Sequence, residues 1–187
     1  MKRGAEMDFY GVIQRRLSVR AYKPDPVPEP ALSRILEAGR LAPSAKNYQP
    51  WKFIVVKDEK IRQELVPACR NQRFIAEAPI VICACAILDQ AWKGMGGYWS
   101  SAEVDVAIAL EHIILAAAAE GLGTCWIGAF IEAEVKRVLQ IPEGVKPVAL
   151  TPLGYPAQES QPRPRRPIEE IVCYNRWGAC PTAWPTS

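Results

Sequence analysis

The sequence predicts a single domain whose core is built from both helices and strands. Its 187 residues are enough for one sizeable core, and 49% of them are apolar while 23% are charged, as in an ordinary globular domain. Apolar residues recur at helical spacing in several segments, and residues 80–88 form a continuous apolar run of strand length. We expect one domain over residues 1–187, with a core from about 9 to 177 and a loose tail over 178–187.

Predicted helices and strands follow one another along the chain. Apolar faces at helical spacing predict helices around residues 9–17, 32–39 and 135–139, and Asp58 can cap a short helix through Leu65. Aromatic and β-branched residues or apolar runs predict strands at residues 51–56, 80–88 and 148–154. The proline-rich segment 23–30 is a connector between the first two helices.

The longest predicted helix begins at the capping-box pattern Ser100-x-x-Glu103 and runs to about Glu120, with Gly121 as its C-cap. It is apolar around most of its surface, so it must be buried in a large core or in an oligomer interface. Because the chain is short, we expect this helix to be shared across a homodimer. His112, the only histidine, lies in it between apolar neighbours and is interpreted as a core residue.

Composition excludes several classes of function. The net charge of +3 is too small to indicate nucleic acid or an anionic membrane as a partner. No apolar run approaches the roughly 20 residues of a membrane span, and the N-terminus lacks the apolar stretch of a signal peptide. We therefore expect a cytoplasmic protein. The six cysteines form no C-x-x-C pair, so we expect no metal site, and Cys83 and Cys85 are interpreted as small buried residues.

The loop over residues 41–53 presents polar side chains on a stiff backbone. Pro43 and Pro50 fix φ, and Ser44, Asn47 and Gln49 lie between them. The amides of Asn47 and Gln49 each offer donors and an acceptor on one flat group, which suits the edge of a planar heterocycle. The alternative is that Asn47 only turns the chain.

Two basic clusters are candidates for binding an anion. Arg16, Ser18 and Arg20 alternate where the first helix ends, so an extended backbone would point all three the same way. Arg163 and Arg165 lie in a polar, proline-rich segment near the C-terminus. The alternatives are that the first cluster only complements a helix dipole and that the second is solvated.

Three further segments have functional interpretations. The glycines of residues 121–130 match no dinucleotide or P-loop motif but let the backbone pass close to a flat ligand. The polar turn at residues 70–73 offers Asn71 or Gln72 as another amide, or is a plain surface turn. The aromatic, glycine-rich loop 89–101 is either a lid or a surface that packs against a partner subunit.

Four of these motifs resemble the FMN-dependent nitroreductase family: Arg-x-Ser-x-Arg from Arg16, Pro-Ser-x-x-Asn-x-Gln-Pro-Trp from Pro43, Gly-Leu-Gly-x-x-x-Ile-Gly from Gly121, and the basic segment from Arg163. They occur in the family's order, and the resemblance covers about residues 9–177. It implies an α+β fold with a mixed central sheet flanked by helices, in an intertwined homodimer with FMN at the interface. Leu17 departs from the pattern and could offer only its backbone.

The resemblance also implies a function. FMN would carry hydride from NADH or NADPH through its N5 atom to a nitroaromatic, a quinone or a similar small-molecule acceptor, with no catalytic side chain required. Gly128 would supply a backbone N–H near N5, Arg20 a cation near N1, and Arg165 or Arg163 a phosphate contact. The full expected cofactor site is Arg16, Leu17, Ser18, Arg20, Pro43, Ser44, Ala45, Asn47, Asn71, Gln72, Trp126, Ile127, Gly128, Arg163 and Arg165.

Two other functions are compatible with the same residues. One is a flavin-binding or storage module without turnover. The other is a different reaction on the same scaffold, either reductive dehalogenation or destruction of the flavin.

Overall fold

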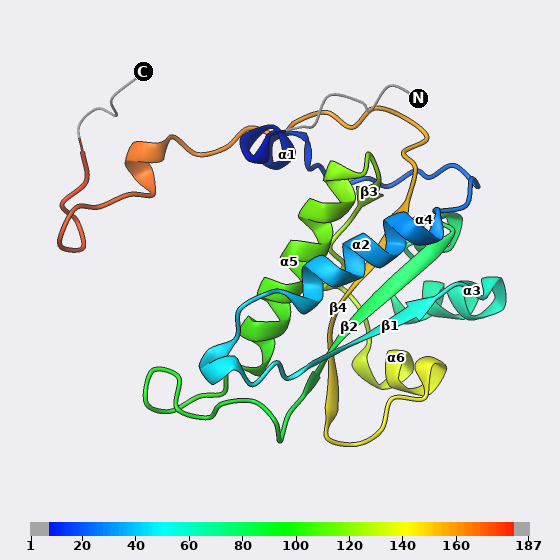
Figure 1. The fold of residues 1–187 in the computed structure, drawn as a ribbon, viewed down its shortest axis with the longest axis horizontal. Helices are drawn as coiled ribbons and strands as arrows, with labels where there is room; N and C mark the ends of the chain where they lie inside the picture. Colours follow the sequence, from blue (N-terminus) through cyan, green and yellow to red (C-terminus); the bar gives the residue numbers. More distant parts are fainter. Residues whose placement is uncertain (1–7, 182–187) are drawn as a thin grey trace.

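A computed structural model describes residues 8–181 and shows a four-stranded sheet with helices on both faces (Figure 1). The strands are β1 (Trp51–Val56), β2 (Ile80–Ile87), β3 (Gly123–Thr124) and β4 (Val145–Gly154). The helices are α1 (Phe9–Arg15), α2 (Glu29–Arg40), α3 (Glu59–Ala68), α4 (Phe74–Glu77), α5 (Ala102–Ala119) and α6 (Glu132–Leu139), with 3₁₀ turns η1 (Ala45–Asn47) and η2 (Ile168–Glu170).

The sheet has the strand order β1-β2-β4-β3, and the named strands all pair antiparallel. An isolated parallel bridge joins Ser18 to Thr124 at the end of β3. The α+β class is therefore confirmed, and the mixed character expected of the sheet rests on this one bridge. It matters for the site because it fixes the segment after α1 against β3.

Strand β2 divides the interior into two cores. Its even-numbered residues, such as Ile82, face α2 and α5, and its odd-numbered residues, such as Cys83, face α3, α4 and α6. The alternation follows from the period of two along a strand. All residues of β2 from Ile80 to Ala86 are buried, which confirms the prediction of a strand covered on both faces and the interpretation of Cys83 and Cys85 as core residues.

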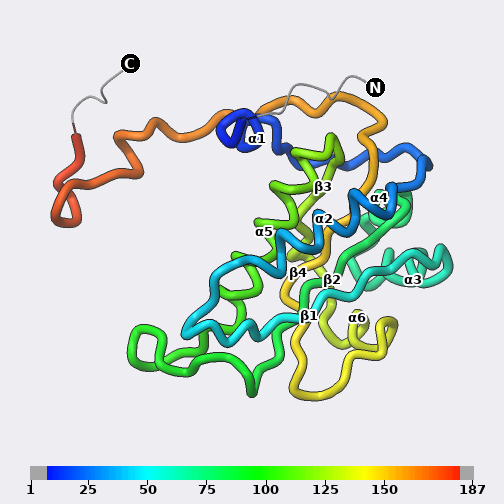
Figure 2. Tube along the Cα trace, viewed as in Figure 1, coloured from blue at the N-terminus to red at the C-terminus, as the bar shows by residue number. Residues whose placement is uncertain are grey.

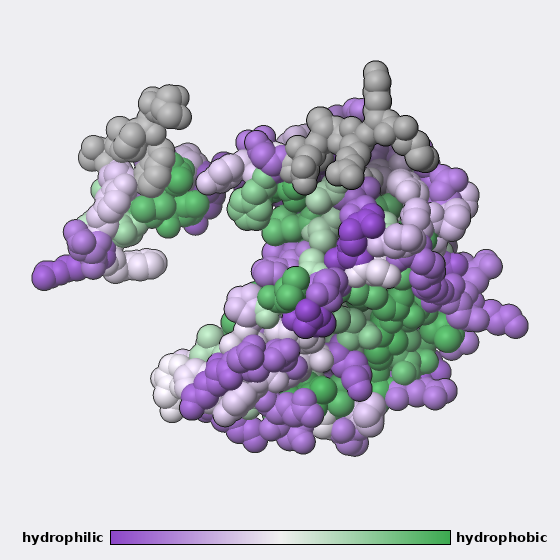
Figure 3. All heavy atoms as spheres, in the orientation of Figure 1, coloured by the Kyte–Doolittle hydropathy of each residue, from purple (hydrophilic) through white to green (hydrophobic). Residues whose placement is uncertain are grey.

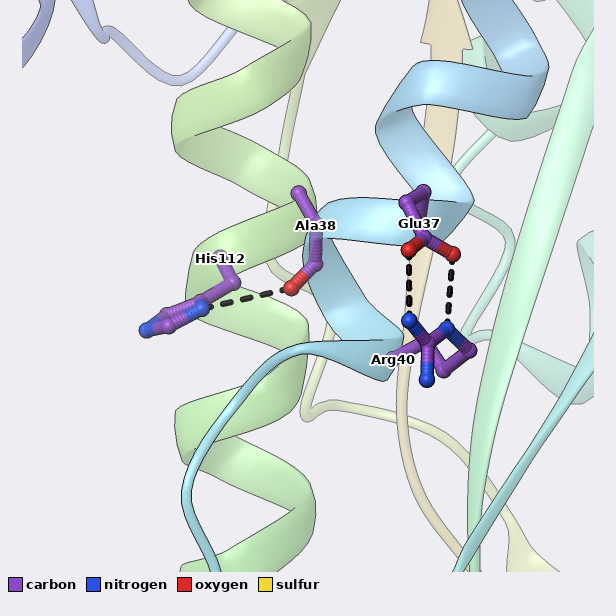
Figure 4. A network of polar contacts seen from close by, with 4 residues as sticks. All are labelled: Glu37, Ala38, Arg40 and His112. Atoms are coloured by element: carbon purple, nitrogen blue, oxygen red, sulfur yellow. Dashed lines mark hydrogen bonds and ion pairs between the residues drawn. The ribbon is translucent and has the colours of Figure 1, made fainter.

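Helix α5 is the long central helix of the first core, and it packs along α2. Three apolar residues on it, Val104, Ile108 and Leu115, stay only half-buried within the chain. They recur at intervals of four and seven residues and so share one face of the helix. His112 lies on α5 as predicted, but it is only half-buried and so is not the core residue expected. Its Nδ1 lies 3.3 Å from the carbonyl oxygen of Ala38 on α2, near the Glu37–Arg40 ion pair (Figure 4).

Helices α2 and α5 approach closely at Gly39. A Cβ atom placed there would lie 2.7 Å from Cγ1 of Ile113, a residue that is fully buried. We expect Gly39→Ala to lower the free energy of unfolding by about 1–3 kcal/mol because the packed core must shift to admit the methyl group. Urea unfolding tests this, with Ser33→Ala on the exposed face of α2 as the control. Equal stability of the two variants would contradict the close approach.

Two predicted helix caps have different outcomes. Asp58 caps α3 as expected, because its side chain accepts a hydrogen bond from Ile61 N at 3.0 Å. The capping box at Ser100 and Glu103 is confirmed only in its first half, because the Ser100 hydroxyl accepts a hydrogen bond from Ala102 N at 3.2 Å, whereas Glu103 does not complete it. Helix α5 begins one residue later, and the carboxylate of Glu103 instead pairs with Lys146 Nζ at 2.7 Å. The positive φ of +76° at Gly121 confirms it as the residue that ends α5.

The chain leaves the packed body after β4 and continues as an extended arm, residues 158–181, which runs past α1 (Figure 2). Figure 3 shows an open hollow between the end of the arm and the body. Large apolar residues on the arm are exposed, with 62% of Ile171 and all of Trp177 accessible. The body of its own chain does not cover this surface. Of the tail predicted at residues 178–187, residues 182–187 lie outside the described residues.

Candidate functional site

The segment after α1 presents its arginines as the alternating pattern predicts. Helix α1 ends at Arg15, and Arg16 takes an extended conformation at its C-cap. Val19 is buried and its N–H donates to Thr124 O at 2.8 Å, whereas Ser18 and Arg20 on either side are exposed. Pairing with β3 therefore turns Ser18 and Arg20 outward together.

Arginine from the C-terminal arm meets this segment. Burial raises the pKa of the Cys125 thiol at the end of β3, while the charges of Arg20 and Arg163 and a hydrogen bond from Ser18 oppose that rise. These three residues are therefore within electrostatic reach of one buried atom. Segments about 140 residues apart in the sequence are brought together, as expected for a shared anion site.

The two basic clusters line one cavity of about 480 Å³. Four guanidinium groups and one carboxylate line it, so positive charge dominates. Its lining includes Arg16, Leu17, Ser18, Arg20, Glu159, Arg163 and Arg165. The guanidinium of Arg165 donates to the carbonyl oxygen of Arg163 at 3.1 Å. Among residues 8–181 it forms no ion pair with a carboxylate, so its charge remains available to an anion.

The glycine-rich segment continues from β3 alongside β4. Ile127 is buried, and its backbone N–H and C=O both pair with Leu150. Trp126 and Gly128 on either side are exposed. A Cβ on Gly128 would have no neighbour closer than 3.8 Å. The backbone at Gly128 is thus open to a ligand, whereas the Ile127 side chain supports the turn from the core.

In the turn after α3, the side-chain amides of Asn71 and Gln72 have different surroundings. Gln72 Nε2 donates to Cys69 O at 2.9 Å and to Ala129 O at 3.1 Å, which ties the turn to the glycine-rich segment. Asn71 is exposed and has a positive φ of +59°. The donors of Gln72 are therefore engaged within the protein, and Asn71 is the amide left to meet a ligand.

The loop between α2 and β1 is held in an unusual conformation. Lys46, Asn47 and Gln49 all have φ between +50° and +58°, a region that non-glycine residues rarely adopt. The hydroxyl of Ser44 accepts a hydrogen bond from Gln49 N at 2.9 Å. The amide of Gln49 donates to Asn47 O at 3.0 Å, so it is engaged inside the loop. The Asn47 side chain is exposed.

A buried carboxylate that the sequence analysis missed anchors this loop. Asp105 is only 2% exposed, and its Oδ1 accepts a hydrogen bond from Ala45 N at 2.9 Å. Its Oδ2 accepts from the Ser101 hydroxyl at 2.7 Å. The first turn of α5 is a favourable place for negative charge. The sequence does carry a signal for this anchor, namely an acidic residue on the apolar side of a predicted helix. A carboxylate buried there needs hydrogen-bond partners.

Two groups of predicted site residues, loop 43–49 and the arginine cluster, lie toward opposite ends of α5. Loop 43–49 is tied to the first turn of α5 through Asp105, and the cavity that adjoins the arginine cavity is lined by Ala118 and Gly121 at its last turn. The 18 residues of α5 span about 27 Å. In Figure 1, η1 lies at one end of α5 while α1 and the start of the arm lie at the other. One chain therefore presents two separate half-sites.

The chemistry of the half-sites suits a flat ligand that carries a phosphate. The cavity supplies guanidinium groups for an anion, and Gly128, Asn71 and Asn47 supply open backbone and amides for a heterocycle. Within residues 8–181, no group of three or more His, Cys, Asp or Glu side chains is placed to hold a metal ion. None of the helices in this range is long and apolar enough to cross a membrane.

Comparison with known proteins agrees with this geometry. The model of the Nitroreductase family matches residues 13–73 and 68–155. The "NADH dehydrogenase" of Thermus thermophilus is 34% identical over 191 residues, covering 86% of this chain and 92% of that protein. The "FMN reductase (NAD(P)H)" of Bacillus subtilis is 31% identical over 170 residues, covering 82% and 68%.

Solved structures share the fold across nearly the whole chain. A nitroreductase family protein from Clostridium novyi NT is 35% identical, with a TM-score of 0.73 over 93% of this chain and 97% of that chain. A nitroreductase family protein from Clostridium difficile 630 is 27% identical, with a TM-score of 0.83 over 91% and 99%. The family model, the sequence relatives and the fold agree, and the chain belongs to the nitroreductase family.

Proposed function

We propose that the protein is an FMN-dependent oxidoreductase that uses NADH or NADPH to reduce a small-molecule acceptor such as a nitroaromatic or a quinone. The observation that carries the proposal is the convergence of Arg16, Arg20, Arg163 and Arg165 on one cavity. A cluster of arginines with one carboxylate suits the terminal phosphate of FMN. The relative named FMN reductase supports the same cofactor.

The site is completed by a second copy of the chain. Loop 43–49 and the arginine cavity lie toward opposite ends of α5, a helix about 27 Å long, so the two half-sites of one chain do not meet around one flavin. The half-buried face of Val104, Ile108 and Leu115 on α5 and the exposed side chains of Ile168 and Ile171 on the arm are surfaces for a partner. A homodimer would place the loop of one chain against the arginine cavity of the other, with FMN at the interface.

The two half-sites would bind different parts of the cofactor. Arg163 and Arg165 hold the phosphate with Arg16 and Ser18, and Leu17 contributes its backbone. Arg20, whose charge acts on the Cys125 thiol at the end of β3, supplies a cation near the N1 edge. Gly128 offers its backbone to the N5 edge, and Trp126 and Asn71 flank it. From the other chain, Pro43, Ser44, Ala45 and Asn47 bind the remaining edge of the ring.

Bound FMN would supply the transfer of hydride from the nicotinamide to the acceptor. The residues of the chain bind it, orient it and stabilise charge. Arg20 would balance negative charge on the reduced ring, and the fixed turn at Gly128 would hold the ring edge at a constant distance. On this proposal no side chain needs to act as a nucleophile or base.

Release of the cofactor and turnover test this proposal together. The purified protein should be yellow, and heat should release FMN and not FAD. The loaded protein should oxidise NADH or NADPH when a quinone or nitroaromatic is added, with the acceptor reduced in equal amount. A yellow protein without NAD(P)H oxidation would indicate a storage module, and loss of halide from the acceptor or breakdown of the flavin would indicate a different reaction.

Asp105 provides a test of the loop. We expect Asp105→Ala to release Ala45 N, to speed amide exchange in residues 43–50 about tenfold or more, and to weaken FMN binding by a similar factor, since the strained loop loses its buried anchor. Asp105→Asn keeps an oxygen for Ala45 N and should restore most of both properties. Hydrogen-exchange mass spectrometry and FMN titration measure them. Unchanged exchange in Asp105→Ala would contradict the anchoring role.

A further inference from the structure

Two cysteines near the end of the arm lie in direct contact. The Sγ atoms of Cys173 and Cys180 are 2.8 Å apart, and both residues are exposed. An S–S bond is about 2.05 Å long, so the two sulfurs would move by less than about 1 Å to form one. The pair lies in the arm, outside both half-sites of the proposed FMN site.

A tight turn of the backbone holds the two sulfurs together. Tyr174 N donates to Ala179 O at 2.8 Å, so the residues next to each cysteine are joined directly. Inside the turn, Ala179 N donates to Arg176 O at 3.2 Å, and Gly178 has a positive φ of +85°. A glycine meets this backbone requirement without strain. The contact between the thiols is therefore set by local structure and does not depend on a distant element.

The other four cysteines lack access to solvent. Cys69, Cys83, Cys85 and Cys125 are all buried, so an external disulfide cannot reach their sulfur atoms in the folded protein. Cys83 and Cys85 also lie near each other, with Sγ atoms 3.7 Å apart, but they lie within β2 in the core. Only the arm pair combines contact with access to solvent.

We propose that Cys173 and Cys180 are a site of reversible disulfide formation by exchange with a low-molecular-weight disulfide. The thiolate of one cysteine attacks the external disulfide, forms a mixed disulfide and releases one external thiol. The second cysteine then attacks the mixed disulfide and releases the other external thiol. The two cysteine thiols lose two protons and two electrons in total, and the external disulfide takes up both and is reduced to two thiols.

Formation of this bond would close a ring around the most exposed residue of the arm. The ring contains residues 173–180, and the Trp177 side chain within it is fully accessible. The covalent ring of the oxidised chain allows fewer conformations of this segment than the open, reduced chain does. The oxidised arm would present Tyr174 and Trp177 on a fixed loop, and a reductant would release that loop.

The sequence places a trypsin site between the two cysteines, which makes the test direct. Trypsin cuts after Arg176, so an intact bond would keep the peptide containing Cys173 attached to the peptide that begins at Trp177. The full-length protein is incubated with glutathione disulfide, alkylated with N-ethylmaleimide and digested without reduction. We expect the linked pair of peptides, lighter than the sum of the reduced peptides by two hydrogen atoms and separable with dithiothreitol.

Controls distinguish the pair from general thiol oxidation. Cys173→Ser should lose the linked peptides and leave Cys180 carrying one glutathione. The buried cysteines should take up N-ethylmaleimide only after unfolding. The proposal is overturned if the wild-type protein carries separate glutathione adducts on both cysteines, if both are alkylated after oxidation, or if the bond joins two chains. None of these outcomes depends on whether the protein binds FMN.

Discussion

Arg165→Ala is expected to weaken FMN binding about ten- to a hundredfold while riboflavin binding barely changes. The arm carries Arg165 to the cavity that Arg16, Arg20 and Arg163 also line, and riboflavin lacks the phosphate that these residues would hold. Fluorescence titration with the two flavins measures the difference. Arg137→Ala, which removes an exposed arginine on α6, is the control for charge alone. An equal loss for both flavins would contradict a phosphate role.

Arg20→Ala should behave differently if the residue lies near N1. Both FMN and riboflavin should then bind more weakly, and the midpoint potential of the bound flavin should fall, because the negative reduced ring loses a cation. A redox titration of the loaded variant provides this second readout. Should the potential stay the same while only FMN binding weakens, Arg20 is one more phosphate ligand.

A charge on the half-buried face of α5 is expected to abolish both the dimer and the flavin site. Ile108→Glu places a carboxylate between Val104 and Leu115, on the face that α2 and the sheet leave partly open. Desolvating that charge in an interface would cost several kcal/mol. Because each flavin is proposed to contact both chains, the monomer should bind FMN at least about a hundredfold more weakly.

Light scattering and FMN titration test the Ile108 variant, and circular dichroism checks that the monomer remains folded. Ala133→Glu, at an exposed position of α6, introduces the same side chain away from the proposed interface and should leave both properties unchanged. A monomeric Ile108→Glu protein that binds FMN as tightly as the wild type would show that one chain suffices for the site.

Much of the fold followed from local patterns. The apolar run at β2, the aromatic and β-branched residues of β1, and the cap at Asp58 each act within a few residues, so the sequence alone predicted them. The capping role of Glu103 was mispredicted because it depends on a distant partner, Lys146 on β4, which pairs with the Glu103 carboxylate. Strand β4 begins three residues earlier than predicted, at Val145.

In the candidate site too, features set by neighbouring residues were predictable from the sequence, and features set by long-range packing were not. Alternation along an extended chain correctly placed Ser18 and Arg20 on one side, and the glycine at position 128 is as open as its sequence context predicted. The separation of loop 43–49 from the arginine cavity was not predictable from spacing in the sequence, because it follows from the length and packing of α5. The engagement of Gln72 with two carbonyl oxygens likewise appears only once α3 and the glycine-rich segment are packed together.

The proposal that two chains share each flavin is tested most directly with mixed dimers. One chain carries Arg20→Ala and Arg165→Ala, which damage the anion half-site, and the other carries Asn47→Ala and Asp105→Ala, which damage the loop half-site. The two are co-expressed with different affinity tags, and dimers containing both are purified. We predict that neither parent dimer retains FMN, whereas the mixed dimer binds one FMN per two chains, because one of its sites combines two undamaged halves. Mixed dimers that bind no more FMN than the parents would contradict the shared site.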